Sequence, residues 1–316
     1  VLERQIKNPR MSATVSEIAS AVRRGDPLNQ GLAKSPRVFS KLFVAMVRSG
    51  EEGGDLPASL TIIADQMERM YNLKKKVRGA LIYPTIVVIA MVGIGVLMMT
   101  NVVPTLAQTF AEMNAALPSS TLIIIAISDF LLEYTTLALS LFVGIVALVY
   151  LAMRTPLGKR AGDLFALRLP LIGALVREVN AARTSRTLAS LLSSGVSVLS
   201  ALEITGEVLQ NTYFKDVIRD AAKSVERGEP LSASFVRRED LYPAFVGEMM
   251  AVGEETGQTT EMLKRLAIFY EDEVDRKTKD MSTVIEPFLM VFIGAGVGFF
   301  AVSMITPIYS LSQNIG

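Results

Sequence analysis

Long apolar runs divide this chain into segments that suit a lipid bilayer and segments that suit water. The apolar runs are residues 80–103, 134–153 and 284–308, and Glu286, at the start of the third, is their one charged residue. Each run is near the ~20 residues with which an α-helix crosses ~30 Å of hydrocarbon. The pattern predicts three transmembrane helices, although residues 121–128 are also apolar and make the start of the second helix less sharp.

The polar segments between these runs show the spacing of amphipathic helices. Apolar residues recur at intervals of three and four in the second polar segment, and part of that pattern recurs in the first. These positions are Met262, Leu263, Leu266, Phe269, Tyr270 and Val274, with Leu60, Ile63 and Met67 in the first segment. Clear β-alternation is absent, so we expect an all-α membrane protein.

A shift of 203 residues aligns the start of the chain with its end without gaps. It aligns Arg24-Gly25-Asp26-Pro27-Leu28 with Arg227-Gly228-Glu229-Pro230-Leu231, and Gly50-Glu51-Glu52-Gly53-Gly54 with Gly253-Glu254-Glu255-Thr256-Gly257. The same shift aligns Pro84, Gly93, Gly95 and Pro104 with Pro287, Gly296, Gly298 and Pro307. Self-similarity at one spacing predicts a duplicated unit, which here is a helical domain followed by a membrane helix.

We place the two homologous helical-bundle domains at residues 1–79 and 154–283. The second domain has a helical stretch, residues 171–202, before the point that aligns with Val1. The first domain lacks a counterpart of that stretch, so we expect it to be incomplete at its N-terminus. The sequence as it stands shows no signal peptide.

The basic residues are confined to the two polar domains. All 32 Lys and Arg lie in residues 1–79 and 154–283, whereas the loop 104–133 and the tail 309–316 contain none. Basic residues are retained on the cytoplasmic side of a membrane, so we expect both domains and the N-terminus there, and the loop and the C-terminus on the opposite side. The expected anchors at the membrane boundary, in contact with lipid headgroups, are Lys74, Lys75, Lys76, Arg78 and Arg154.

The composition excludes most familiar catalysts. The chain has no Cys, His or Trp, which removes disulfides, Cys or His metal sites and imidazole acid–base chemistry. It has no Gly-x-x-x-x-Gly-Lys-Ser/Thr sequence, so a nucleotide would have to belong to a partner. We expect no enzyme activity, no cofactor and no metal.

Two rival functions are a transporter or channel subunit and an intramembrane hydrolase. Coupled transport usually needs buried ionisable groups, and the three apolar runs contain none beyond Glu286. A hydrolase would need an Asp pair, a His or a Ser–Lys dyad in the spans, which are absent. Small residues could instead provide close helix packing, at Gly93, Gly95, Gly294, Gly296 and Gly298, or could simply reflect how common Gly is in membrane helices.

The carboxylate pairs Glu51-Glu52 and Glu254-Glu255 are the candidate functional residues. Adjacent residues do not face each other on a helix, so they suit acid–base catalysis poorly. A structural interpretation is that the flanking Gly residues end a helix while the carboxylates favour the positive end of the next one. Contact with a partner protein and binding of a cation such as calcium remain as alternatives.

The order of domain, span, loop, span, domain and span resembles the bacterial type II secretion F family, which includes the type IV pilus platform proteins. The segments that carry the resemblance run from Val252-Gly253-Glu254-Glu255-Thr256-Gly257 through Ile285-Glu286-Pro287 to Met304-Ile305-Thr306-Pro307-Ile308-Tyr309. Ser193-Ser194-Gly195-Val196-Ser197-Val198-Leu199 resembles the turn that opens the family's domains. Gly53-Gly54, where the second copy has Thr256-Gly257, is a mild departure.

The resemblance implies a multispan scaffold in the bacterial inner membrane that performs no bond chemistry itself. Its expected partners are a hexameric assembly ATPase, pilins or pseudopilins, other inner-membrane assembly proteins, membrane lipid and further copies of the chain. Nucleic acid is not expected as a direct partner, although an assembled machine could take up DNA. The scaffold would couple the ATPase to the extraction of pilin subunits from the bilayer.

Overall fold

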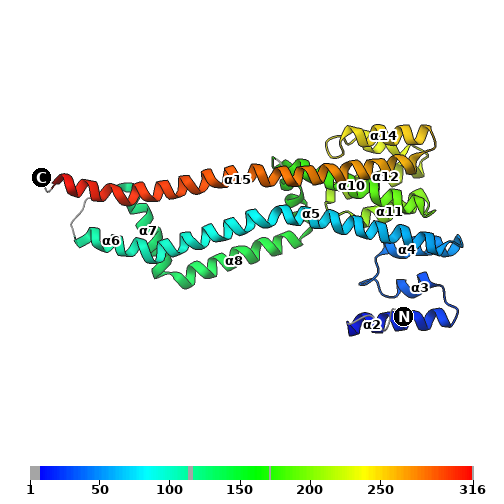
Figure 1. Ribbon diagram of the computed structural model, residues 1–316, viewed down its shortest axis with the longest axis horizontal. Coiled ribbons are helices and arrows are strands. Elements are labelled where there is room, and N and C mark those ends of the chain that lie inside the picture. Colours follow the sequence, from blue (N-terminus) through cyan, green and yellow to red (C-terminus); the bar gives the residue numbers. More distant parts are fainter. Residues whose placement is uncertain (1–7, 113–116, 171, 315–316) are drawn as a thin grey trace. The chain divides into compact units, whose positions relative to one another are not determined.

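Helices joined by short turns make up a computed structural model of the chain (Figure 1). The structure describes residues 8–112, 117–170 and 172–314, and no strand occurs among them. The expected all-α class is confirmed. The chain divides into two compact units, residues 1–76 with 160–277, and residues 77–159 with 278–316.

The first unit contains two copies of the same helical arrangement. The first copy consists of α2 (Pro9–Arg23), α3 (Leu28–Ala33), α4 (Lys41–Glu52) and the start of α5 (Leu56–Leu97). The second copy consists of α12 (Thr212–Glu226), α13 (Leu231–Val236), α14 (Ala244–Glu255) and the start of α15 (Thr259–Asn314). The shift of 203 residues found in the sequence carries the bounds of α2, α3 and α4 onto those of α12, α13 and α14.

Glycines close the corresponding turns of both copies. Gly25 and Gly228 follow α2 and α12 with φ of 95° and 79°, and Gly54 and Gly257 follow α4 and α14 with φ of 73° and 69°. Positive φ is strained for residues that have a Cβ, so these turns depend on Gly. The predicted repeat of two helical bundles is confirmed.

The second copy has additional helices and a well-filled core. α9 (Pro156–Arg168), α10 (Ile172–Ser193) and α11 (Val198–Val208) precede α12. The Tyr242 ring packs edge-on against Phe214 and Phe235, with ring centroids 5.0 and 4.8 Å apart. The Tyr242 hydroxyl and Thr184 Oγ1 share a hydrogen bond of 2.8 Å, which satisfies the one polar group of a fully buried side chain.

The second unit contains the apolar helices. The ranges Leu56–Glu112, Thr135–Arg154 and Thr259–Thr306 are long and apolar enough to cross a membrane, which agrees with the three predicted spans. The first range comprises α5, a short π-helix η1 (Met98–Val102) and α6 (Val103–Glu112), and the second range is α8 (Thr135–Arg154). α7 (Ser119–Glu133) ends just before α8, with Tyr134 between the two helices.

α6 and α7 lie in the segment expected as the loop 104–133, of which residues 121–128 were noted as apolar. Val103 and Phe110 are buried with Ile124 of α7 and Met304 of α15. Thr121 Oγ1 donates to the Ser303 carbonyl at 2.5 Å, and Ser128 Oγ donates to the Met99 carbonyl at 2.6 Å. The two hydroxyls hold α7 against the neighbouring helices because each donates a hydrogen bond to a backbone carbonyl of those helices.

Candidate functional site

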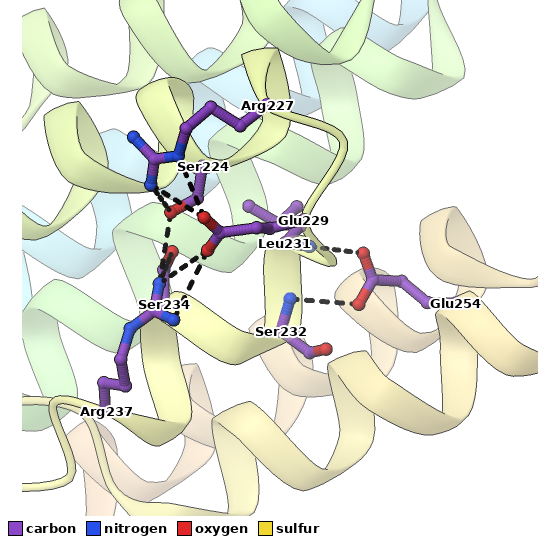
Figure 2. Close-up of polar contacts among 8 residues, drawn as sticks. All are labelled: Ser224, Arg227, Glu229, Leu231, Ser232, Ser234, Arg237 and Glu254. Carbon is purple, nitrogen blue, oxygen red and sulfur yellow. Dashed lines mark hydrogen bonds and ion pairs between the residues drawn. The ribbon is translucent and has the colours of Figure 1, made fainter.

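The two Gly-Glu-Glu turns lie at the ends of α4 and α14, and each contains one inward and one outward carboxylate. Glu254 Oε1 accepts from the Leu231 backbone N–H at 2.6 Å, and Oε2 accepts from the Ser232 N–H at 3.0 Å (Figure 2). In the first copy, Glu51 accepts from the N–H groups of Leu28 and Asn29 at 2.6 and 2.8 Å. The first Glu of each pair therefore holds the N-terminus of a short helix, α13 or α3.

Both short helices lack a side-chain cap of their own. Their N-cap residues are Pro27 and Pro230, and neither makes a side-chain capping hydrogen bond. The first N–H groups of a helix have no partner within the helix, and they carry a partial positive charge. Glu51 and Glu254 supply the missing acceptor and a negative charge at the same place.

The Gly before each pair allows a close approach between helices. A Cβ on Gly253 would lie 3.0 Å from Thr259 Cα and 3.0 Å from Met262 Cγ. A Cβ on Gly50 would meet Ser59 and would lie 3.3 Å from Leu56 Cα. α14 and α4 thus turn back tightly onto α15 and α5, which fixes the direction of each carboxylate pair.

The second Glu of each pair faces solvent. The Glu52 side chain is 63% exposed and its carboxylate bonds Arg48 Nε at 2.7 Å, one helical turn earlier. Glu255 is exposed and forms no ion pair among the residues that the structure describes. The sequence suggested the pairs as units, but the structure separates an internal carboxylate from an external one.

Arginines bind the turn before α13. Glu229 accepts from Arg227 Nε at 2.9 Å and from Arg237 at 3.4 Å, and Ser224 Oγ contacts both arginines (Figure 2). The hydrogen bond from Arg227, followed by that from Ser224, lowers the pKa of the Glu229 carboxyl. The corresponding pair in the first copy, Arg24 and Asp26, is looser at 3.8 Å. The role of Arg237 was missed in the sequence because it lies outside the aligned motif.

A polar seam joins the two copies within the first unit. Gln66, which is 1% exposed, accepts from Ser190 Oγ at 2.8 Å and donates to Thr187 at 3.4 Å. Lys41 bonds Glu207 at 2.6 Å, and Ser49 Oγ donates to the Ser194 carbonyl. A groove of about 700 Å³ lies beside these contacts, and its lining includes Arg48, Glu52 and Glu203.

The proposed membrane anchors have different surroundings. Lys76 pairs with Asp275 at 3.0 Å, whereas Lys74, Lys75 and Arg78 are exposed. Arg154 donates to the Tyr150 hydroxyl at 2.6 Å, and its guanidinium lies 4.8 Å from the Tyr150 ring centroid. Their contact with lipid remains a prediction.

The glycines of the spans leave open space. A Cβ on Gly93, Gly95, Gly294, Gly296 or Gly298 would meet no atom within 4 Å in the described part of the chain. Among the described residues, no group of three or more Asp or Glu is placed to hold a metal ion.

Comparison with known proteins yields matches over most of the chain. The family model for type II secretion system protein F matches residues 1–104 and 184–307. The type IV pilus assembly protein PilC of Thermus thermophilus is 35% identical over 98% of this chain and 76% of its own length. The PilC of Myxococcus xanthus is 34% identical over 100% and 75%. The type II secretion system protein F of Pseudomonas aeruginosa is 31% identical over 99% and 77%.

Proposed function

Because this chain belongs to the type II secretion system protein F family, we propose that it is the inner-membrane platform of a type IV pilus or a type II secretion machine. The observation that carries the proposal is the match across nearly the whole chain to assembly proteins of both machines. Three membrane helices and a duplicated polar domain support a scaffold that lies in the bilayer and presents binding surfaces outside it.

The platform would act by binding, without catalysing a reaction itself. Its polar domains would contact the hexameric ATPase of the machine, and its membrane helices would receive pilin or pseudopilin subunits. The open glycine faces at Gly93 and Gly294 suit such contacts, because small residues let helix backbones approach closely in lipid. In this way ATPase motion would be coupled to the extraction of subunits from the bilayer.

The external carboxylates are the proposed ATPase contacts. Glu52 and Glu255 are exposed at matching places in the two copies, whereas Glu51 and Glu254 are occupied by helix N–H groups. A basic surface on the ATPase would pair with these external carboxylates. Charges at the solvent-exposed edge of an interface mainly raise the rate of association and determine which partner binds.

The test is capture of the assembly ATPase by the purified full chain in nanodiscs, compared with Glu52→Lys, Glu255→Lys and the double variant. We expect the double variant to lose capture and fibre assembly while its level in the membrane is unchanged, since like charges repel across an interface. Glu239→Lys is the matched control, because Glu239 is also exposed in the second domain.

Two results would count against the proposal at different levels. Normal capture of the ATPase by the double variant would show that Glu52 and Glu255 do not contact the ATPase, but it would not contradict the platform function. The platform function would be refuted if the unchanged protein failed to capture the ATPase and if cells without this protein still assembled fibres normally.

A further inference from the structure

α9 has one face that packs on protein and one that does not. On the packed face, Leu167 is buried and Asp163 accepts from the Thr212 N–H at 2.8 Å, which holds the start of α12. Arg160 lies over the Tyr213 ring at 5.3 Å and pairs with Asp216 at 3.3 Å. These contacts fix the rotation of α9 about its own axis.

The opposite face is apolar and exposed. Leu157, Ala161 and Phe165 follow one another at intervals of four residues, so they lie on one side of the helix. Leu157 is 83% exposed and Phe165 is 65% exposed. Exposed aliphatic and aromatic side chains aligned on one helix face are typical of an interaction surface.

The start of α9 is held against the end of the membrane helix α8. Thr155 is extended, with φ of −76° and ψ of 150°, which breaks the helix between Arg154 and Pro156. Its hydroxyl donates to the Ala152 carbonyl at 2.7 Å and accepts from the Gly158 N–H at 3.0 Å. A Cβ on Gly158 would lie 2.6 Å from the Ala152 carbonyl carbon, so this tight corner requires Gly.

Two basic groups of α9 are free in the described part of the chain: Arg168, three residues after Phe165, lies on the apolar side, and Lys159 lies on the other side of the helix. Lys159 and Arg168 are exposed, and neither forms an ion pair within the described ranges. Arg154, with its Tyr150 contact, ends the preceding span. Helices that lie in the plane of a membrane combine an apolar face with Lys and Arg and are attracted to anionic headgroups.

We propose that α9 lies in the headgroup region of the bilayer, with Leu157, Ala161 and Phe165 inserted at the acyl boundary and Lys159 and Arg168 on anionic headgroups. Continuity with α8 favours lipid as the occupant of this face, because Thr155 is the one residue that separates the two helices. The surface would hold the second domain at the membrane independently of any ATPase contact.

The chain contains no Trp, so a single introduced Trp reports on one place. We would prepare Leu157→Trp and Phe165→Trp in vesicles whose phosphatidylcholine and phosphatidylglycerol carry brominated acyl chains. Val38→Trp, at a residue that is 43% exposed in the first domain, is the control. We expect blue-shifted emission and bromine quenching at positions 157 and 165, and water-like emission without quenching at position 38.

Water-like, unquenched emission at position 165 would overturn the proposal, even with quenching at position 157. Blue-shifted emission without bromine quenching would overturn it too, because a protein surface rather than lipid would then cover the face. In Phe165→Trp, adding Lys159→Gln and Arg168→Gln should reduce quenching in vesicles that contain phosphatidylglycerol but not in phosphatidylcholine alone. If the two substitutions reduced quenching equally in both lipids, Lys159 and Arg168 would not act by binding anionic headgroups.

Discussion

The first turn of α13 follows Pro230, which has no side-chain acceptor, so its free N–H groups depend on Glu254, 23 residues later in the chain. The same relation holds between Pro27 and Glu51 in the first copy. A carboxylate that accepts two backbone hydrogen bonds at a helix N-terminus combines charge-assisted bonding with the helix dipole. At the residue scale, the inner Glu of each pair has a structural task that the outer Glu lacks.

Glu254→Ala should therefore destabilise the protein, whereas Glu255→Ala should not. We expect a loss of about 0.5–2 kcal/mol for Glu254→Ala, the range found for loss of a helix cap, and less than ~0.5 kcal/mol for the exposed Glu255→Ala. Thermal unfolding followed by circular dichroism, with amide exchange at Leu231 and Ser232, would measure this. Equal behaviour of the two variants would contradict the assignment.

Glu178 carries a different prediction, because its carboxylate is buried. Burial raises the pKa of Glu178 more than the contact with Lys277 lowers it, and Glu178 Oε2 has no hydrogen-bond partner among the described residues. A carboxyl whose folded pKa is raised favours folding below its ordinary pKa, and this contribution is lost as the pH rises through the folded pKa.

Glu178→Gln should thus raise the unfolding temperature at neutral pH relative to the unchanged protein, and the difference should disappear at pH values below the ordinary carboxyl range. Unfolding measured from acid to neutral pH checks the sign. A variant that is less stable at neutral pH would mean that the Lys277 pair outweighs the cost of burial.

At the element scale, much of the fold could be predicted because the residues that recur in the two copies are those that form the turns between helices. Gly25, Gly54, Gly228 and Gly257 all adopt positive φ, so the aligned glycines marked real helix ends. The expectation that the carboxylates favour the positive end of the next helix was wrong: Glu254 binds the start of α13, which precedes it, because its target depends on how α14 packs against α13. Residues 121–128 of α7 were noted as apolar, but the packing of α6 and α7 could not be predicted because it rests on a few contacts distant in sequence, such as Thr121 with Ser303.

Gly253→Ala tests the close contact between α14 and α15. The added Cβ would lie 3.0 Å from Thr259 Cα, which is backbone and cannot rotate away, so we expect a loss of about 1–3 kcal/mol from overpacking. Gly79→Ala is the matched control, because a Cβ there meets nothing within 4 Å in the described chain and Ala favours a helix over Gly. If Gly253→Ala were as stable as the control, the turn would not need its first Gly.

At the scale of the whole molecule, we propose that the three apolar helices all cross the membrane, which would place residues 1–79 and residues 309–316 on opposite sides of it. Charge decides which side each end occupies. The polar domains hold all 32 Lys and Arg, and the connection between the first two spans holds none, so the energetic preference for retaining basic segments acts on both domains in the same direction. We propose that residues 1–79 and 154–283 are cytoplasmic and that residues 104–133 and 309–316 are periplasmic.

Because the chain has no Cys, single cysteines can test this topology without background. Gln108→Cys, in α6, and a cysteine added after Gly316 should react with a membrane-impermeant maleimide in intact cells. Glu68→Cys and Lys264→Cys, which are exposed in the first and second domains, should react only after the inner membrane is opened. Labelling of all four cysteine variants after the inner membrane is opened shows that each cysteine is accessible to the maleimide.

If the C-terminal cysteine were protected in intact cells while Gln108→Cys was labelled, the third apolar helix would not cross the membrane. Labelling of Glu68→Cys in intact cells would reverse the whole orientation and leave the domains unable to reach a cytoplasmic ATPase.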